Sequence, residues 1–167
     1  MFASSTLYAQ NNSSTIKALA NSIRSHKNIE VSFTYQIVGD PNIPEDVKEG
    51  KAYFQNEAYK VILEDQENIS DGKTLWQYLI DDEEVMVSDA FEEDNPLSIL
   101  DELEKDSSGI TPVTDNKGDL QKIELAMDDG VRLILNVNEM KYDQDLKKGF
   151  FTFDEKAHPN VEIIDMR

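Results

Sequence analysis

The feature that most constrains the fold is a series of short segments in which apolar and polar residues alternate. Val31, Phe33, Tyr35 and Ile37 alternate with polar residues, which is typical of a strand with its large side chains on one face. Further strand candidates lie at residues 51–55, 58–64, 68–70, 74–80, 84–88, 120–127, 131–137 and 150–153, with 161–164 as a candidate last edge. Because parallel neighbours need long crossovers, the short loops predict an antiparallel meander of eight or nine strands.

Two other segments have the spacing of amphipathic helices. Residues 15–24 place apolar side chains from Ile16 to Ile23 on one stripe, and a serine before them can cap the start. Asn95-Pro96 suits the first positions of a second helix over 97–104, which has a face rich in leucine. A long sheet tends to curl, and these helices are the available covers for its concave face. The enclosed space is then either a filled core or a ligand chamber, and the residue pattern alone favours the filled core.

Composition excludes several classes of protein. The chain has 16 Lys and Arg against 34 Asp and Glu, a net charge of −18, so it lacks the basic surface that nucleic acids or anionic membranes require. There is no cysteine, which excludes disulfides and thiolate metal sites, and His26 and His158 are the only histidines. The acidic runs lack the spacing of a calcium loop, and no catalytic constellation is visible. The sequence therefore predicts a protein that is not an enzyme and needs no metal or cofactor.

The first residues bear on location. Residues 1–12 contain small residues near Ala9-Gln10, which is typical of the end of a secretory signal just before its cleavage site. We therefore expect residues 1–12 to be a signal remnant or a disordered tail, and residues 13–167 to form one domain. No run of 18 apolar residues occurs, so no membrane span is predicted.

The segment Ser70–Tyr78, SDGKTLWQY, is the most distinctive in the chain. Asp71-Gly72 predicts a tight turn, and Trp76 and Tyr78 then share one face of the next strand. This segment resembles the hallmark of the periplasmic outer-membrane lipoprotein carriers, the LolA-like proteins. The resemblance extends, in the same order, through the segments 31–35, 49–50, 84–85, 95–97 and 151–154.

The resemblance implies a fold, a ligand and partners. The fold is an incomplete, strongly curved antiparallel barrel covered by a helical lid, and its chamber holds the acyl chains of a lipoprotein that crosses the periplasm. The implied partners are acylated lipoproteins, an inner-membrane export complex and an outer-membrane receptor, with the carrier itself a monomer. The candidate ligand surface consists of aromatic and aliphatic side chains: Phe33, Tyr35, Ile37, Tyr53, Tyr59, Val61, Leu63, Trp76, Tyr78, Leu97, Leu100 and Leu103.

Two departures from the family pattern stand out. In family members the turn after the second strand carries an arginine that holds the lid shut, whereas this turn reads Gln55-Asn56-Glu57. Residues 106–118 read as a loop, where the family places one or two further strands, which predicts a smaller sheet.

Binding and transport of lipoprotein acyl chains is the leading interpretation. A lipid or lipoprotein sensor on the same fold, without a transport role, is the alternative that the two departures favour. A filled domain without a ligand is a further rival, and a lipid hydrolase is disfavoured because no nucleophile and base are paired.

Overall fold

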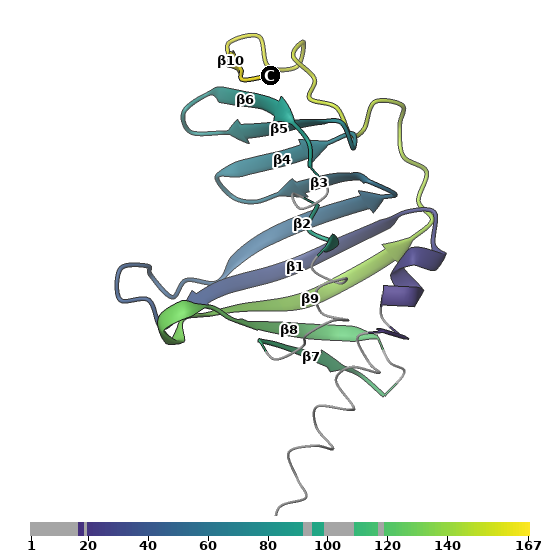
Figure 1. The fold of residues 1–167 in the computed structure, drawn as a ribbon, viewed down its shortest axis with the longest axis vertical. Helices are drawn as coiled ribbons and strands as arrows, with labels where there is room; N and C mark the ends of the chain where they lie inside the picture. The colour runs from purple at the N-terminus through teal and green to yellow at the C-terminus, as the bar shows by residue number, and fades with distance from the viewer. Residues whose placement is uncertain (1–16, 19, 92–94, 99–108, 117–118) are drawn as a thin grey trace, which may run out of the picture.

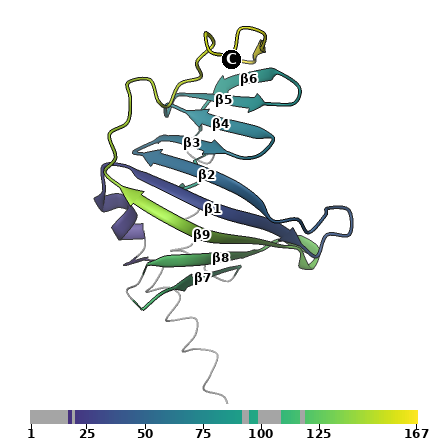
Figure 2. The same ribbon diagram turned by 180° about the vertical axis from the view of Figure 1, so that it is seen from behind.

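The computed structural model describes residues 17–18, 20–91, 95–98, 109–116 and 119–167. These residues form one open sheet of ten strands in the order β10-β6-β5-β4-β3-β2-β1-β9-β8-β7 (Figure 1 and, from behind, Figure 2). The strands are β1 (Ile29–Val38), β2 (Lys48–Gln55), β3 (Ala58–Ile62), β4 (Gln66–Ser70), β5 (Thr74–Leu79), β6 (Glu84–Asp89), β7 (Ile110–Thr114), β8 (Leu120–Ala126), β9 (Arg132–Tyr142) and β10 (Glu162–Asp165). The mainly β architecture and the unclosed sheet confirm that part of the predicted fold class.

Every neighbouring pair of these strands is antiparallel except β10 and β6. The chain leaves β9 at one side of the sheet and returns to the far edge through residues 143–161, the C-terminal strap. This long connection lets β10 pair parallel with β6, with Ile163 opposite Val85. The predicted last edge at 161–164 therefore exists, but the prediction of a purely antiparallel sheet is wrong.

The pairing register defines two faces of the sheet. Val31 lies opposite Ala52, which lies opposite Val61, so their side chains share one face, the cavity face. Tyr53, one residue from Ala52, lies opposite Lys60 and belongs to the other face, the back face. Because side chains alternate along a strand, these pairings assign residues of the neighbouring strands to one face or the other.

A bulge keeps β9 apolar on the cavity face over its whole length. Phe33 lies opposite Val137 and Ser32 lies opposite Glu139, so the register shifts by one residue between them. Strict alternation would place Glu139 on the cavity face, whereas the bulge moves Met140 there instead. The predicted strand ends at 137 because the alternation breaks here, but the real strand continues to Tyr142.

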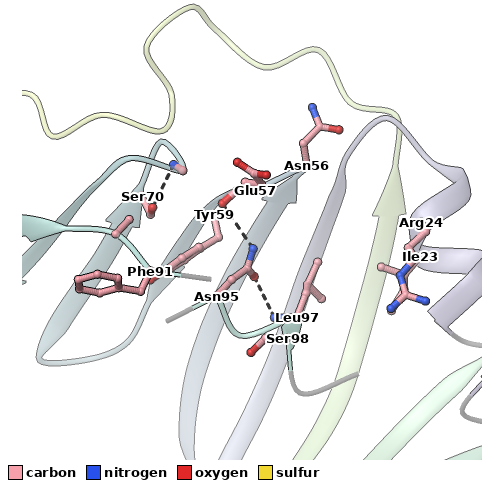
Figure 3. Close-up of a pocket in the computed structure, with 12 residues that line it drawn as sticks. Ile23, Arg24, Asn56, Glu57, Tyr59, Ser70, Phe91, Asn95, Leu97 and Ser98 are labelled. Atoms are coloured by element: carbon pink, nitrogen blue, oxygen red, sulfur yellow. Dashed lines mark hydrogen bonds between the residues drawn. The ribbon is translucent and has the colours of Figure 1, made fainter. Parts of the chain in front are cut away.

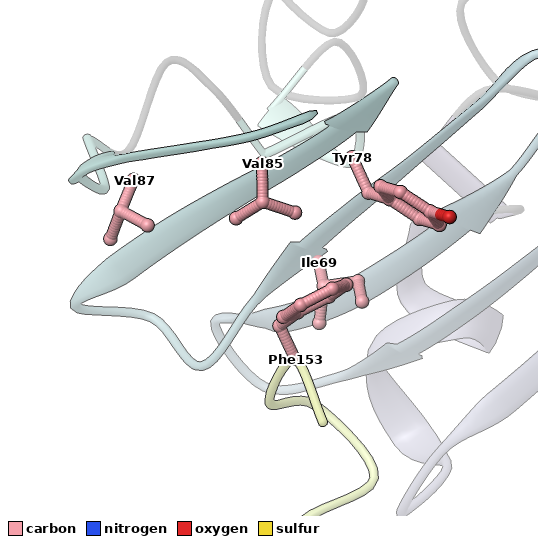
Figure 4. Packing of buried hydrophobic residues seen from close by; sticks show 5 residues of the cluster. All are labelled: Ile69, Tyr78, Val85, Val87 and Phe153. Atoms are coloured by element: carbon pink, nitrogen blue, oxygen red, sulfur yellow. The ribbon is translucent and has the colours of Figure 1, made fainter. Parts of the chain in front are cut away.

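The back face of β4, β5 and β6 is closed by the C-terminal strap. Phe153 of the strap packs with Ile69, Tyr78, Val85 and Val87, all at most 8% exposed (Figure 4). The prediction of a strand at 150–153 is wrong. The amide of Thr152 donates to the carbonyl of Gly149 in a turn, which delivers the Phe153 ring to this cluster.

Two other expectations can be compared with the structure. The predicted loop at 106–118 contains β7, an edge strand whose Pro112 lies opposite Ile123 of β8, so the expectation of no strand there is wrong. Residues 20–25 are helical as predicted, and Ala20 is fully buried among Ile23, Leu97 and Ile110. Most of the predicted lid helix, including Leu100 and Leu103, and the predicted tail at 1–12 lie outside the described residues.

Candidate ligand-binding cavity

The cavity face encloses a space of about 290 Å³ between the sheet and the segments that cover it. The sixteen lining residues that belong to the described part of the chain are all hydrophobic: Ile23, Ile29, Val31, Phe33, Ala52, Phe54, Val61, Pro96, Leu97, Ile110, Leu120, Ile123, Leu125, Leu135, Val137 and Met140. Six strands, β1, β2, β3, β7, β8 and β9, supply most of these side chains. A lining of this kind can hold an apolar group.

Gly50 creates room for one wall of this cavity. A Cβ atom on Gly50 would lie 2.5 Å from Cε2 and Cζ of Phe33, the residue opposite it on β1. The absence of a side chain at Gly50 therefore allows the Phe33 ring to lie over the backbone of β2. Leu63 approaches the same glycine from the other side.

Asn95 positions the segment that covers the cavity. Its Oδ1 accepts a hydrogen bond from the amide of Leu97 at 2.9 Å, and its carbonyl accepts one from the amide of Ser98 at 2.8 Å. The Asn95 side-chain amide donates to the carbonyl of Glu57, 3.4 Å away in the β2–β3 turn (Figure 3). Asn95 thus makes the predicted cap and also ties the start of the covering segment to the sheet.

The SDGKTLWQY segment has a structural role in the hairpin between β4 and β5. Asp71 Oδ1 accepts hydrogen bonds from the amides of Lys73 and Thr74 at 2.9 and 2.8 Å, and Ser70 Oγ accepts one from the amide of Gly72 at 3.1 Å. Gly72 has φ +88°, and a Cβ there would lie 3.0 Å from Glu57 Cβ. The turn fixes the register of β5 and so sends Trp76 and Tyr78 to one face.

That face is the back face, which corrects the predicted position of three aromatic residues. Trp76 lies opposite Ile69 and packs on the back-face cluster, and the Tyr78 ring lies 5.4 Å from the Phe153 ring. Tyr53 lies 4.8 Å from Phe150 of the strap, ring to ring. All three belong to the packing against the strap and do not line the cavity. Their alternation within each strand is as predicted, but alternation does not say which face the strap covers.

The other predicted ligand residues lie on the cavity face or outside the described residues. Phe33, Val61 and Leu97 line the cavity itself. Tyr35 and Ile37 follow Phe33 on the same face of β1, and the Tyr35 ring is 6.1 Å from the Phe33 ring. Tyr59 and Leu63 share this face at the border of the cavity, whereas Leu100 and Leu103 are not described. Their binding of a ligand stays a prediction.

Several cavity residues escaped the sequence prediction. Ile123 and Leu125 on β8, and Leu135 and Val137 on β9, alternate as clearly as the residues of β1. Period-two spacing could have identified these four. Ile110 and Leu120 carry no such signal. Ile110 lies in the segment that the sequence predicts to be a loop, and a register shift beside Thr114 takes Leu120 out of the alternation of β8.

A second, more polar pocket of about 350 Å³ adjoins the cavity (Figure 3). It shares Ile23 and Leu97 with the cavity, and its lining also includes Arg24, Glu57 and Ser70. The Asn56-Glu57 turn, where family members carry arginine, forms part of this pocket. An arginine is present at its edge, but the helical segment supplies it as Arg24.

The titratable groups near the cavity sit at its borders. Burial raises the pKa of Tyr35, and also that of Tyr142, so both phenols stay neutral at physiological pH. His26 Nδ1 lies 2.9 Å from Asp143 Oδ2, and this hydrogen bond, together with the amide of Lys27, lowers the pKa of Asp143. The His26 ring also stacks on Tyr142 at 4.1 Å, which joins the end of the helical segment to the end of β9.

Two absences hold for the part of the chain that the structure describes. No three or more His, Cys, Asp or Glu side chains are grouped so that they could hold a metal ion. No helix within the described ranges has the length and apolar character needed to cross a membrane.

Comparison with known proteins identifies similar folds. No family model and no curated protein matches the chain. An uncharacterized conserved protein from Thermus thermophilus matches with a TM-score of 0.59 at 10% identity, over 91% of this chain and 99% of that chain. A LolA superfamily protein from Nitrosomonas europaea matches with a TM-score of 0.48 at 13% identity, over 86% of this chain and 98% of that chain.

A further match is a putative outer membrane lipoprotein-sorting protein domain from Vibrio parahaemolyticus, with a TM-score of 0.44 and 11% identity over 86% of this chain and 97% of that chain. LolA-like proteins are therefore among the structural neighbours. At these identities the likeness concerns the fold.

Proposed function

We propose that this protein binds acyl chains in the apolar cavity and carries acylated lipoproteins. The observation that carries the proposal is the cavity of about 290 Å³, whose lining among the described residues is entirely hydrophobic. The side chains that form its walls leave this space open beside a segment that Asn95 anchors to the sheet. Ligand sites of this kind are concave, apolar and largely pre-formed.

The size of the cavity limits how much of a lipid it takes. An apolar cavity of about 150 Å³ accommodates benzene, which has six carbons, so a space twice as large suits about a dozen carbons. Each buried CH₂ contributes about 0.8 kcal/mol, so a dozen supply about 10 kcal/mol before the entropic cost of binding. The cavity therefore suits most of one acyl chain better than several chains together.

The wider role extends this proposal. Together with the resemblance to the lipoprotein carriers, the site supports transport through the periplasm toward the outer membrane. An inner-membrane export complex would load the protein and an outer-membrane receptor would unload it, with the carrier acting as a monomer and without catalysis. The net charge of −18 would keep a loaded carrier from lodging on anionic membranes.

Two measurements test acyl-chain binding. Mass spectrometry of protein purified from its native envelope is expected to detect co-purified acyl lipid. Val61→Phe is expected to weaken dodecanoyl-ligand binding, because the ring enters the cavity. If it displaces two CH₂ groups, about 1.6 kcal/mol is lost, which is a roughly tenfold weaker Kd.

Val113→Phe is the matched control, since Val113 is 45% exposed on the edge strand β7 and does not line the cavity. Equal affinity in both variants and the original protein would refute the assignment of the cavity. Rescue of lipoprotein sorting in cells depleted of their own carrier separates transport from the alternative, a sensor that binds lipid but does not carry it.

A further inference from the structure

We propose that a polar strip beside the acyl cavity recognises an uncharged hydrogen-bond donor attached to the acyl chain, an amide N–H or a hydroxyl. The strip consists of Asn68 on β4 and Gln77 on β5. This inference rests on the proposed acyl-chain binding and adds a second subsite to it.

The strip continues the cavity face beyond the apolar walls. Val61 on β3 lies opposite Asn68, and Asn68 lies opposite Gln77, so the three side chains follow one another across the same face. They line a further space of about 200 Å³ together with Tyr59, Leu75 and Pro96. Val61 and Pro96 also line the acyl cavity. The two spaces therefore adjoin each other at Val61 and Pro96, which places the polar strip next to the acyl cavity.

The side-chain oxygen of Asn68 lacks a hydrogen-bond donor among the described residues. Its Oδ1 is buried and accepts no hydrogen bond from any residue that the structure describes. Buried acceptors without a partner are rare, because such an atom loses its hydrogen bonds to water and gains none in return. A ligand donor that reaches Oδ1 from this space would satisfy it, which gives a reason for a polar side chain at this position between Val61 and Gln77.

The character of the strip selects the kind of ligand group. Asn68 and Gln77 are uncharged, and none of the six residues that line the space is a cation. A carboxylate or phosphate would therefore meet the acceptor Oδ1 without a compensating positive charge in the lining. A neutral donor bonded at the end of an acyl chain, by contrast, brings its hydrogen to Oδ1 while the chain stays in the apolar cavity.

The test compares four ligands that share one chain length. N-methyldodecanamide and dodecan-1-ol each carry a donor, methyl dodecanoate carries none, and dodecanoate carries a negative charge. Binding to the unmodified protein is measured by displacement of a fluorescent dye, below the concentration at which the ligands aggregate. One net hydrogen bond corresponds to a two- to tenfold change in Kd, roughly, so the amide or the alcohol is expected to bind tighter than the ester by this factor. Whichever of the amide and the alcohol shows the larger decrease in Kd relative to the ester identifies the preferred donor as an amide N–H or a hydroxyl.

Two variants assign the effect to Asn68. Asn68→Leu is expected to abolish the advantage of the donors while methyl dodecanoate binds as before. Asn136→Leu makes the same chemical change on β9, where Asn136 lies opposite Thr34 on the back face, and is expected to keep the advantage.

Three results would overturn the inference. They are equal binding of ester and donors by the unmodified protein, tightest binding of dodecanoate, and a donor preference that survives Asn68→Leu. Each of these leaves acyl-chain binding intact, whereas failure of all four ligands to bind refutes the proposed function and this inference with it.

Discussion

Replacing Gly50 by alanine is expected to change both the stability of the fold and the affinity for a ligand, because the added methyl group collides with a wall of the cavity. The new Cβ would lie 2.5 Å from two atoms at the far end of the Phe33 ring and 3.2 Å from Leu63 Cδ2. Gly50 does not have a positive φ, so the backbone itself accepts alanine. The ring must move, and the open space beside it is the cavity. We therefore expect Gly50→Ala to push Phe33 into the volume that an acyl chain would occupy.

Two opposing terms set the size of the effect on stability. Overpacking a core costs about 1–3 kcal/mol, and the cost falls to the low end where a side chain can swing into a void. Alanine recovers about 0.5–1 kcal/mol, because glycine in a strand loses more conformational entropy on folding. Gly50→Ala is therefore expected to reduce the free energy of unfolding by no more than about 1–2 kcal/mol. The affinity for a dodecanoyl ligand is expected to fall about tenfold, as two CH₂ groups lose their place.

Urea denaturation and dye displacement measure the two effects. Gly109→Ala is the matched control, since its Cβ would meet only the Ala126 carbonyl oxygen at 3.7 Å. In a Phe33→Ala background the same Gly50→Ala change is expected to become stabilising by about 0.5–1 kcal/mol, because the ring is gone. A Gly50→Ala protein that binds the ligand with unchanged affinity, or a change of the same sign in both backgrounds, would refute the reasoning.

Three further predictions concern the back face and the border of the cavity. Phe153→Ala is expected to lower the free energy of unfolding by about 3–5 kcal/mol, measured in urea, without weakening ligand binding by the folded protein, because Phe153 packs on the back face. Asp143→Asn is expected to lower stability at pH 7. Since the pKa of Asp143 is lowered in the folded state, its contribution is present above pH 4, approximately, and disappears as the pH falls through the folded pKa, so the denaturation midpoints of variant and parent should approach each other as the pH is lowered from 4. The emission of Trp76 is expected to stay unchanged at saturating acyl ligand, because its ring packs on the back-face cluster; a spectral shift would place the ligand there instead.

The sequence predicts the strands well wherever apolar and polar residues alternate strictly. The prediction fails where a bulge, a proline or a turn interrupts that alternation. The bulge opposite Ser32 and Phe33 hides the second half of β9, since Glu139 interrupts the apolar period that Met140 then resumes. Pro112 and the polar residues around β7 read as a loop, although an edge strand tolerates proline. Phe151 and Phe153 read as a strand, although turns within the strap place Phe153 on the back-face cluster.

The candidate site could be predicted only in part for a different reason. Alternation shows that Trp76 and Tyr78 share a face and that Phe33 and Tyr35 share a face, but it does not relate the faces of distant strands. The chain of cross-strand pairs from Tyr53 through Lys60 and Ile69 to Trp76 supplies that relation, and it is a property of the assembled sheet. The bulkiest aromatic residues were therefore assigned to a ligand, whereas they pack under the strap.

The two faces of the sheet are covered at opposite ends, and this division bears on how a bound chain could leave. The strap packs on the back of β4, β5 and β6 and reaches Tyr53 on the back of β2, whereas the cavity lies over β1, β2, β3, β7, β8 and β9 on the other face. Behind the cavity, the sheet carries charged pairs such as Lys141 and Glu139 on β9, 2.9 Å apart. Displacing the segment that begins at Asn95 would therefore expose the cavity without disturbing the back-face cluster around Phe153. The back-face cluster and the segment beside the cavity thus lie on opposite faces of the sheet.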